Sequence, residues 1–128
     1  MRFLDVCRNV EAEGRSDHPV PFLLIVQGNH VEVRSSRVVV PLVRAGAAGN
    51  PIRRLMPVFT IGDEQVVMMT PQIAGISTAD IGPSVANLAD HRREIRTAID
   101  ILTGDLYTPA TPATRNGRSS APPAAGGP

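Results

Sequence analysis

Apolar residues gather most densely between residues 55 and 70, in two short runs that a polar segment separates. The first run (56–61) is rich in β-branched and aromatic residues, and the second (66–69) reads Val-Val-Met-Met. The segment between them begins with Gly62-Asp63, and both residue types tolerate the backbone of a tight turn. This pattern predicts an antiparallel β-hairpin, which we expect to form the middle of the core.

The chain before the hairpin contains further strand-like segments, at residues 3–7, 20–27 and 37–43. The continuous apolar run 20–27 is typical of a strand that is covered on both faces or that lies at a subunit contact. Residues 31–34 alternate with period two, which predicts either a strand extension or an ordered loop. Polar and small residues predict loops at 9–18 and 44–52.

After the hairpin the periodicity weakens and then changes. Residues 71–82 predict an irregular segment with one short strand near 77–81. Apolar residues then recur at helical spacing, at Leu88, Ile95, Ala98, Ile99 and Leu102. We therefore expect a helix over 88–103, and the fold class is mainly β with one C-terminal helix.

The ends of this helix carry recognisable signals. Asn87 or Asp90 can act as its N-cap, and Gly104 can act as the C′ residue. The segment 105–128 is rich in Pro, Ala and Gly and has no periodicity, so we expect a disordered tail. The predicted organisation is one folded domain at 1–104 followed by this tail.

Composition narrows the class of protein. Aromatic residues make up 3% of the 128 residues and Trp is absent, so the core must consist of Val, Ile, Leu and Met. Up to Thr103 the chain has 11 Arg and 11 Asp or Glu, and this neutral balance argues against a dedicated nucleic-acid binder. Cys7 is the single cysteine, which fits a reducing compartment. Because no apolar run is long enough to span a membrane and the first ten residues are too polar for a signal peptide, we expect a cytoplasmic protein.

Residues that could carry chemistry are scattered. His18, His30 and His91 have no Cys or carboxylate at metal-ligand spacing, so we predict no metal site and no cofactor. Asp63 and Glu64 are adjacent at a strand end, where side chains point to opposite sides, so they suit a turn better than an acid–base pair. We predict no catalytic residues and interpret the protein as a binding protein.

Two groups of residues could form binding surfaces: the methionines after the second apolar run and the arginines of the predicted helix. Met68 and Met69 point to opposite faces of their strand, so one belongs to the core. The other could serve a contact surface, but we favour ordinary packing. Arg92, Arg93 and Arg96 could bind phosphate, but we interpret them as a solvated helix face.

A set of residues spread over most of the chain carries a family resemblance. In the second half these residues are Pro57, Val58, Ile61-Gly62-Asp63-Glu64, Met68-Met69-Thr70, Ala74, Ile81-Gly82, Val85-Ala86, Leu88, Ile95 and Ala98-Ile99. In the first half they are the Met-x-Phe opening, Val26-Gln27, Arg37, Val39, Pro41 and Leu42. In this set the chain resembles the CcdB toxins of bacterial toxin–antitoxin modules, and the spacing of Ile-Gly-Asp-Glu to Met-Met-Thr is its most specific part.

The resemblance implies a small, twisted antiparallel sheet, similar to SH3-type barrels, that ends in one long helix. It implies a homodimer that binds the DNA gyrase A subunit and inhibits this topoisomerase by trapping it on cleaved DNA. A cognate antitoxin would neutralise the toxin. Toxin and antitoxin together would maintain the plasmid or module and repress their own operon, with the antitoxin supplying the DNA contacts.

The resemblance also implies where these contacts lie. The gyrase-binding tip of the family is Trp-Gly-Ile directly after the helix, and the aligned residues here are Gly104, Asp105 and Leu106. Thr103 precedes this tip, and Asp100 replaces a family Asn one helical turn earlier. The dimer or antitoxin surface is expected at Met69, Ile99 and Leu102.

Two alternatives to gyrase poisoning remain: the missing Trp motivates the first, and the shared barrel fold motivates the second. A buried Trp anchor contributes roughly 2–4 kcal/mol, so its loss weakens binding about thirtyfold to a thousandfold. The first alternative is therefore a homologue that still dimerises and binds an antitoxin but does not poison gyrase. The second is a MazF-like endoribonuclease, in which Arg37 or Arg34 would act with Ser35.

Overall fold

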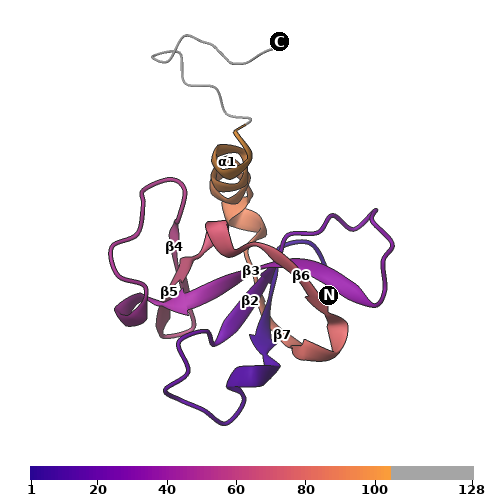
Figure 1. Cartoon of the computed structure of the whole chain (residues 1–128), viewed down its shortest axis with the longest axis horizontal. Coiled ribbons are helices and arrows are strands. Elements are labelled where there is room, and N and C mark those ends of the chain that lie inside the picture. Colours follow the sequence, from indigo (N-terminus) through magenta and orange to yellow (C-terminus); the bar gives the residue numbers. More distant parts are fainter. Residues whose placement is uncertain (105–128) are drawn as a thin grey trace, which may run out of the picture.

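Seven antiparallel strands curl into a half-open barrel in the computed structural model, which describes residues 1–104 (Figure 1). The strands are β1 (Asp5–Asn9), β2 (Phe22–Ile25), β3 (Ser36–Arg44), β4 (Val58–Ile61), β5 (Glu64–Met68), β6 (Ala74–Ser77) and β7 (Ile81–Asn87), and the helix is α1 (Arg92–Thr103). Short 3-10 turns connect several of them. The expected fold class is confirmed, while the predicted tail at 105–128 lies outside the described residues.

The nine-residue strand β3 is the centre of the sheet. One edge of β3 pairs with β2, and its other edge pairs with β6 along the first half and with β5 along the second half. The sheet order is β4-β5-β3-β2-β1-β7, so the β4–β5 hairpin forms one end of the sheet. The hairpin therefore lies at an end of the sheet, although Phe59, Ile61, Val66 and Met68 from it belong to the main core cluster, as we expected of its apolar runs.

Buried apolar side chains of the sheet, of α1 and of the segments beside them form two clusters. The main cluster contains Leu4, Val6, Leu24, Val40, Leu42, Phe59, Ile61, Val66, Met68, Leu88, Ile95 and Ala98. The second contains Cys7, Leu23, Ile25, Val39 and Ile81. Successive residues of β2 enter different clusters, as alternation along a strand requires. The prediction that this strand is covered on both faces is confirmed.

The hairpin has a tighter turn than its sequence suggested. Ile61 pairs directly with Glu64, so only Gly62 and Asp63 form the turn, and Gly62 has a φ of +61°. Glu64 instead begins β5 and forms an ion pair with Arg44.

Two strands were not recognised in the sequence between residues 71 and 87. β6 and β7 occupy most of this segment, whereas we expected residues 71–82 to be irregular with one short strand near 77–81. Residues 78–80 of that expected strand form a 3-10 turn between β6 and β7. Most of their side chains are exposed or half-buried, so they carry no apolar alternation. At Gly82 an added Cβ would lie 3.0 Å from the backbone oxygen of Arg8, which shows how closely β7 approaches β1.

The N-terminal strand and the residues after β2 also differ from the prediction. β1 begins at Asp5, two residues later than expected, because Leu4 has a φ of +68° and turns the chain before the ladder starts. Residues 31–34 are exposed and belong to no strand, so the ordered-loop alternative holds.

The helix begins later than predicted and ends where predicted. Residues 89–91 form a 3-10 turn, and Asn87 Oδ1 accepts from the Ala89 N–H at 2.8 Å just before it. The N-cap of α1 is His91, so the prediction that Asn87 or Asp90 caps the helix is wrong. Gly104 has a φ of +79°, and its N–H donates to the carbonyls of Asp100 and Ile101, which confirms it as the C′ residue. Within residues 1–104 no helix has the length and apolar character needed to cross a membrane.

A buried hydroxyl fixes the loop between β3 and β4. Thr70 is fully buried in the turn on which α1 packs, and its Oγ1 donates to the carbonyl of Leu55 at 2.5 Å. The Met56 N–H donates to the Ile52 carbonyl at 2.8 Å, so the loop closes on itself as well. One side chain thus ties this loop to the sheet beneath the helix.

We expect the substitution Thr70→Val to lower the free energy of unfolding by about 1–3 kcal/mol, because it leaves the Leu55 carbonyl without its donor. Urea denaturation followed by circular dichroism measures this change. The matched control is Thr60→Val, at an exposed position on β4, which should change stability by less than about 0.5 kcal/mol. Equal effects of the two substitutions would contradict the role of the buried hydroxyl.

Cys7 gives a pH-dependent prediction. Burial raises the pKa of its thiol above the usual value of 9.0, the Asp5 carboxylate acts in the same direction, and the amino terminus opposes them. The unfolded chain therefore releases the thiol proton first, and stability should fall as the pH rises above about 9. In Cys7→Ala this part of the pH dependence should vanish. A thiol that reacts with a disulfide reagent as fast in the native protein as in urea would refute the burial.

Candidate functional site

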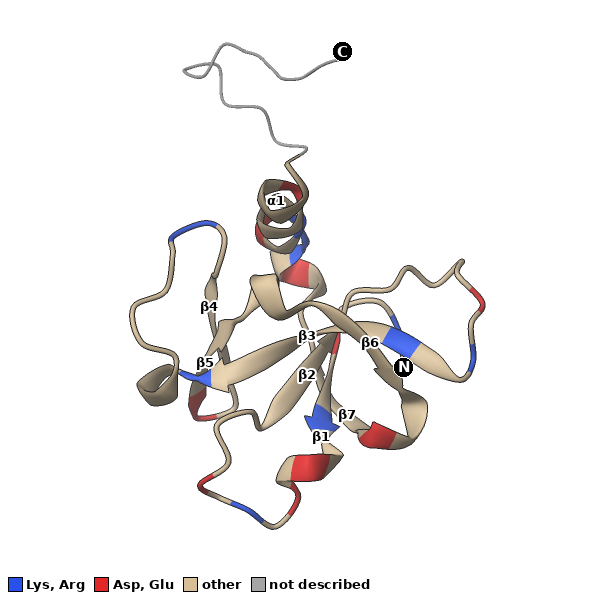
Figure 2. Ribbon diagram, in the orientation of Figure 1, with Lys and Arg blue, Asp and Glu red and all other residues tan. Residues whose placement is uncertain are grey.

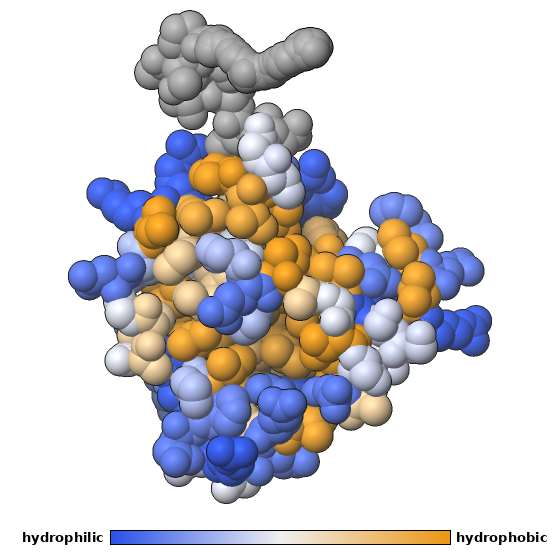
Figure 3. Space-filling model, in the orientation of Figure 1, coloured by the Kyte–Doolittle hydropathy of each residue, from blue (hydrophilic) through white to orange (hydrophobic). Residues whose placement is uncertain are grey.

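Helix α1 stands out from the sheet (Figure 1). Only Ile95 and Ala98 of its residues are fully buried. Charged side chains cluster on the helix, and the space-filling view shows apolar atoms over it with hydrophilic residues on either side (Figures 2 and 3). A surface of this kind suits binding to another protein.

The last turn of α1 brings together three of the residues predicted to bind gyrase. Thr103 donates its Oγ1 hydrogen to the carbonyls of Ile99 and Asp100, at 3.1 and 3.2 Å. Gly104 closes the same turn through its N–H. The exposed tip therefore consists of backbone and small side chains. The other two predicted residues, Asp105 and Leu106, lie outside the described residues.

A depression of about 610 Å³ lies along one flank of α1. It is lined by Phe3, Val26, Gly28, Asn29, His30, Arg92, Arg96, Ile99 and Asp100. The Arg92 guanidinium lies 5.7 Å from the centre of the Phe3 ring, a cation–π distance. Asn29 Oδ1 accepts from the Phe3 N–H at 2.8 Å and holds the N-terminal segment in place. Ile99 and Asp100, which we assigned to different surfaces, thus face the same depression.

The residues predicted for the dimer or antitoxin surface lie on two elements. Ile99 and Leu102 are half-buried on α1, whereas Met69 is half-buried directly after β5. The Met69 N–H donates to the Pro41 carbonyl at 3.0 Å, and Met69 does not line the depression beside α1. Met68 is fully buried, so the prediction that one of the two methionines belongs to the core is confirmed.

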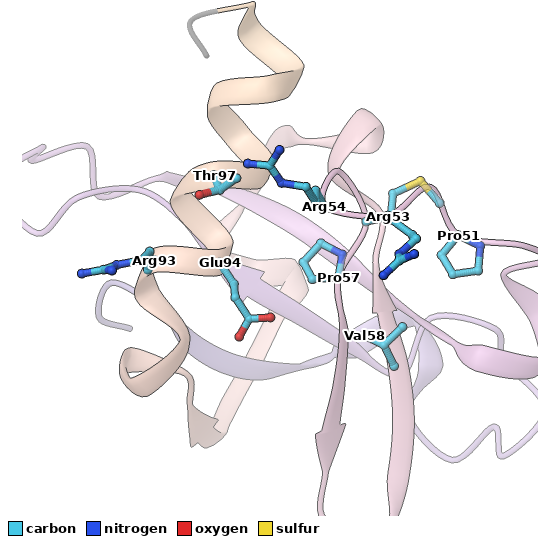
Figure 4. Close-up of a pocket in the computed structure, with 9 residues that line it drawn as sticks. Pro51, Arg53, Arg54, Pro57, Val58, Arg93, Glu94 and Thr97 are labelled. Atoms are coloured by element: carbon cyan, nitrogen blue, oxygen red, sulfur yellow. The ribbon is translucent and has the colours of Figure 1, made fainter. Parts of the chain in front are cut away.

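A second groove of about 540 Å³ runs along α1 beside the loop that precedes β4 (Figure 4). We call it the arginine groove, and its lining residues are Pro51, Arg53, Arg54, Met56, Pro57, Val58, Arg93, Glu94 and Thr97. Sequence reasoning missed it because the loop and the helix are far apart in the chain. The sequence feature that could have indicated this groove is the pair Arg53-Arg54, which has no acidic residue beside it.

The structure shows the surroundings of the residues considered for a metal site and for ribonuclease chemistry. Within residues 1–104 no three His, Cys, Asp or Glu side chains lie together as a metal site requires. The Arg37 guanidinium donates to the carbonyls of Val33 and Ser36, so it is used to hold its own loop. This arrangement gives no support to the ribonuclease alternative, which required Arg37 or Arg34 to act with Ser35.

Comparison with known protein families agrees with the architecture. The sequence model of the family described as CcdB protein matches residues 4–104, which is the whole described domain apart from its first three residues. The match spans all seven strands and α1. The chain belongs to the CcdB family, whose members are the toxins of toxin–antitoxin modules and act on another protein rather than as enzymes.

Proposed function

We propose that this protein is a toxin that binds the A subunit of DNA gyrase through the exposed end of α1 and traps the topoisomerase on cleaved DNA. The family match over residues 4–104 carries this proposal. The projecting helix supports it, because Thr103 and Gly104 in its last turn are exposed in the part of the chain that the structure describes.

The proposal includes a homodimer and a cognate antitoxin. Ile99 and Leu102 remain half-buried on α1, and Met69 remains half-buried beside the sheet. Covering apolar area contributes about 25 cal/mol per Å², so these positions favour association with a second copy or with the antitoxin. Together with the antitoxin, which would contact DNA, the toxin would repress its own operon and maintain its module.

A second candidate function is a homologue that dimerises and binds an antitoxin without poisoning gyrase. The observation that favours it is the helix tip, where Gly104 has no side chain and the whole chain has no Trp. Asp100 adds a negative charge to the same turn. A tip without an aromatic anchor loses the contact that commonly dominates such an interface.

Expression in a gyrase-sensitive bacterium separates the two candidates. The poisoning toxin should stop growth and leave cleaved DNA covalently attached to gyrase, which is detected after denaturation with detergent. Normal growth at high soluble expression, together with binding to the antitoxin, would refute poisoning and support the second candidate.

The substitution Asp100→Asn should strengthen binding to the gyrase A subunit by up to about fivefold. It removes a negative charge from the proposed contact surface and introduces the Asn that the family has at this position. Surface plasmon resonance with the purified subunit measures this affinity. Asp80→Asn removes an exposed charge from the turn between β6 and β7 and should leave the affinity unchanged. If both substitutions had the same effect, the end of α1 would not be the contact.

A further inference from the structure

We propose that residues 105–107, which directly follow the described part of the chain, dock into the depression of about 610 Å³ beside α1 in the same molecule. The depression shares no lining residue with the arginine groove, so it is a separate site. The docking itself requires neither gyrase nor an antitoxin.

The depression has an apolar surface that the fold leaves half covered. Phe3, Val26 and Ile99 pack against the main core cluster, yet each remains half-buried and lines the depression. Covering apolar area contributes about 25 cal/mol per Å², so an apolar side chain that binds here extends the core. The site therefore favours an occupant with apolar side chains.

The walls of the depression are fixed before anything docks. The Phe3 N–H donates to Asn29 Oδ1 at 2.8 Å, and the Arg92 guanidinium lies 5.7 Å from the centre of the Phe3 ring. A Cβ added to Gly28 would lie 2.7 Å from the His30 ring, so the missing side chain of Gly28 lets that ring lie against the backbone. A preformed site loses little conformational freedom when it is occupied.

The chain itself brings an occupant to this site. Gly104 ends α1 with a φ of +79°, a left-handed conformation that turns the chain out of the helix. Ile99 lies five residues before Gly104, which is about 7.5 Å along the axis of an α-helix. An extended chain advances about 3.3 Å per residue, so residues 105–107 are long enough to run back along the helix as far as Ile99.

The side chains of this segment match the depression. Leu106 and Tyr107 are the only Leu, Ile, Val, Met or aromatic residues between 105 and 128. Arg92 and Arg96 line the depression, and a guanidinium group stacks favourably on a tyrosine ring. Asp105 brings a negative charge to a site that holds two arginines and one aspartate. The segment thus supplies the apolar, aromatic and acidic groups that the site can hold.

The covalent connection favours this occupant over one from another molecule. A segment joined to its site by a few residues acts at an effective concentration in the millimolar range. A second copy of the chain, or an antitoxin, that used Ile99 would first have to displace the segment. The depression is therefore occupied first by its own chain.

One consequence of docking rests on the proposed function. The depression contains Asp100, which belongs to the proposed gyrase contact, so a docked segment would compete with gyrase for this residue. Absence of gyrase binding would refute the proposed function. The docking is measured without gyrase, so it would not be affected by that result.

The fluorescence of Tyr107 tests the docking in the full chain. The sequence has one Tyr and no Trp, so tyrosine emission reports on this residue alone. We expect the acrylamide quenching constant of the native chain to be at least about twofold lower than that of a synthetic peptide of residues 104–112, because a docked ring exposes only one face. This protection should be the same at low and high protein concentration, as docking within one molecule requires.

Substitutions in the segment test which residues dock. Leu106→Ser removes the apolar neighbour of Tyr107 and should raise the quenching constant toward that of the peptide. The matched control is Ala110→Ser, which lies beyond the docked segment and should leave the quenching constant unchanged.

Substitutions on the folded domain locate the site. Arg92→Gln with Arg96→Gln removes both guanidinium groups of the depression and should also raise the quenching constant. Arg53→Gln with Arg93→Gln is an equal change of charge in the arginine groove and should not. Circular dichroism checks that both double variants are folded.

Three results would overturn the proposal. The first is a native quenching constant equal to that of the peptide. The second is an equal effect of the two double substitutions. The third is protection that disappears on dilution, which would assign the segment to a second copy of the chain.

Discussion

The sheet depends on the length of β3. Nine residues let one strand pair with β2 along one edge and with both β5 and β6 along the other, so chain segments before and after it meet on a single ladder. A strand of average length could hold only one partner on each edge. Because β5 and β6 diverge from the same edge of β3, the sheet curls and leaves one side on which α1 can pack. The position of the helix, and of both grooves beside it, follows from this arrangement.

The sequence predicted the elements whose side chains are buried and missed those whose side chains are exposed. The hairpin, the doubly covered strand β2 and the Gly104 end of the helix all leave strong local signals, in apolar density or in a residue that tolerates positive φ. β6 and β7 are held mainly by backbone pairing to β3 and β1. Backbone hydrogen bonds do not depend on residue type, so they produce no pattern of apolar and polar residues in the sequence. The arginine groove could not be predicted for a different reason: the loop before β4 and helix α1, which form its two sides, come together only in the folded protein.

Family membership identifies the fold and the general role of this protein, but it does not identify the residues that contact a target. The family match fixes the architecture and the general role, because it covers the domain from Leu4 to Gly104. The gyrase contacts that we propose would depend on a few side chains at the end of α1, where this chain has Asp100, Thr103 and Gly104. A fold can therefore be inherited whole while a binding tip changes at a few positions.

Thr70 has a consequence for the motions of the protein. Its hydroxyl joins the turn after β5 to the loop before β4, which are separated by a complete hairpin in the sequence. The loop cannot detach without breaking a buried hydrogen bond, so its opening is coupled energetically to loosening of the hairpin. A ligand that binds to this loop would therefore also slow the local opening of the β4–β5 hairpin. In turn, a substitution that loosens the hairpin would weaken the binding of that ligand.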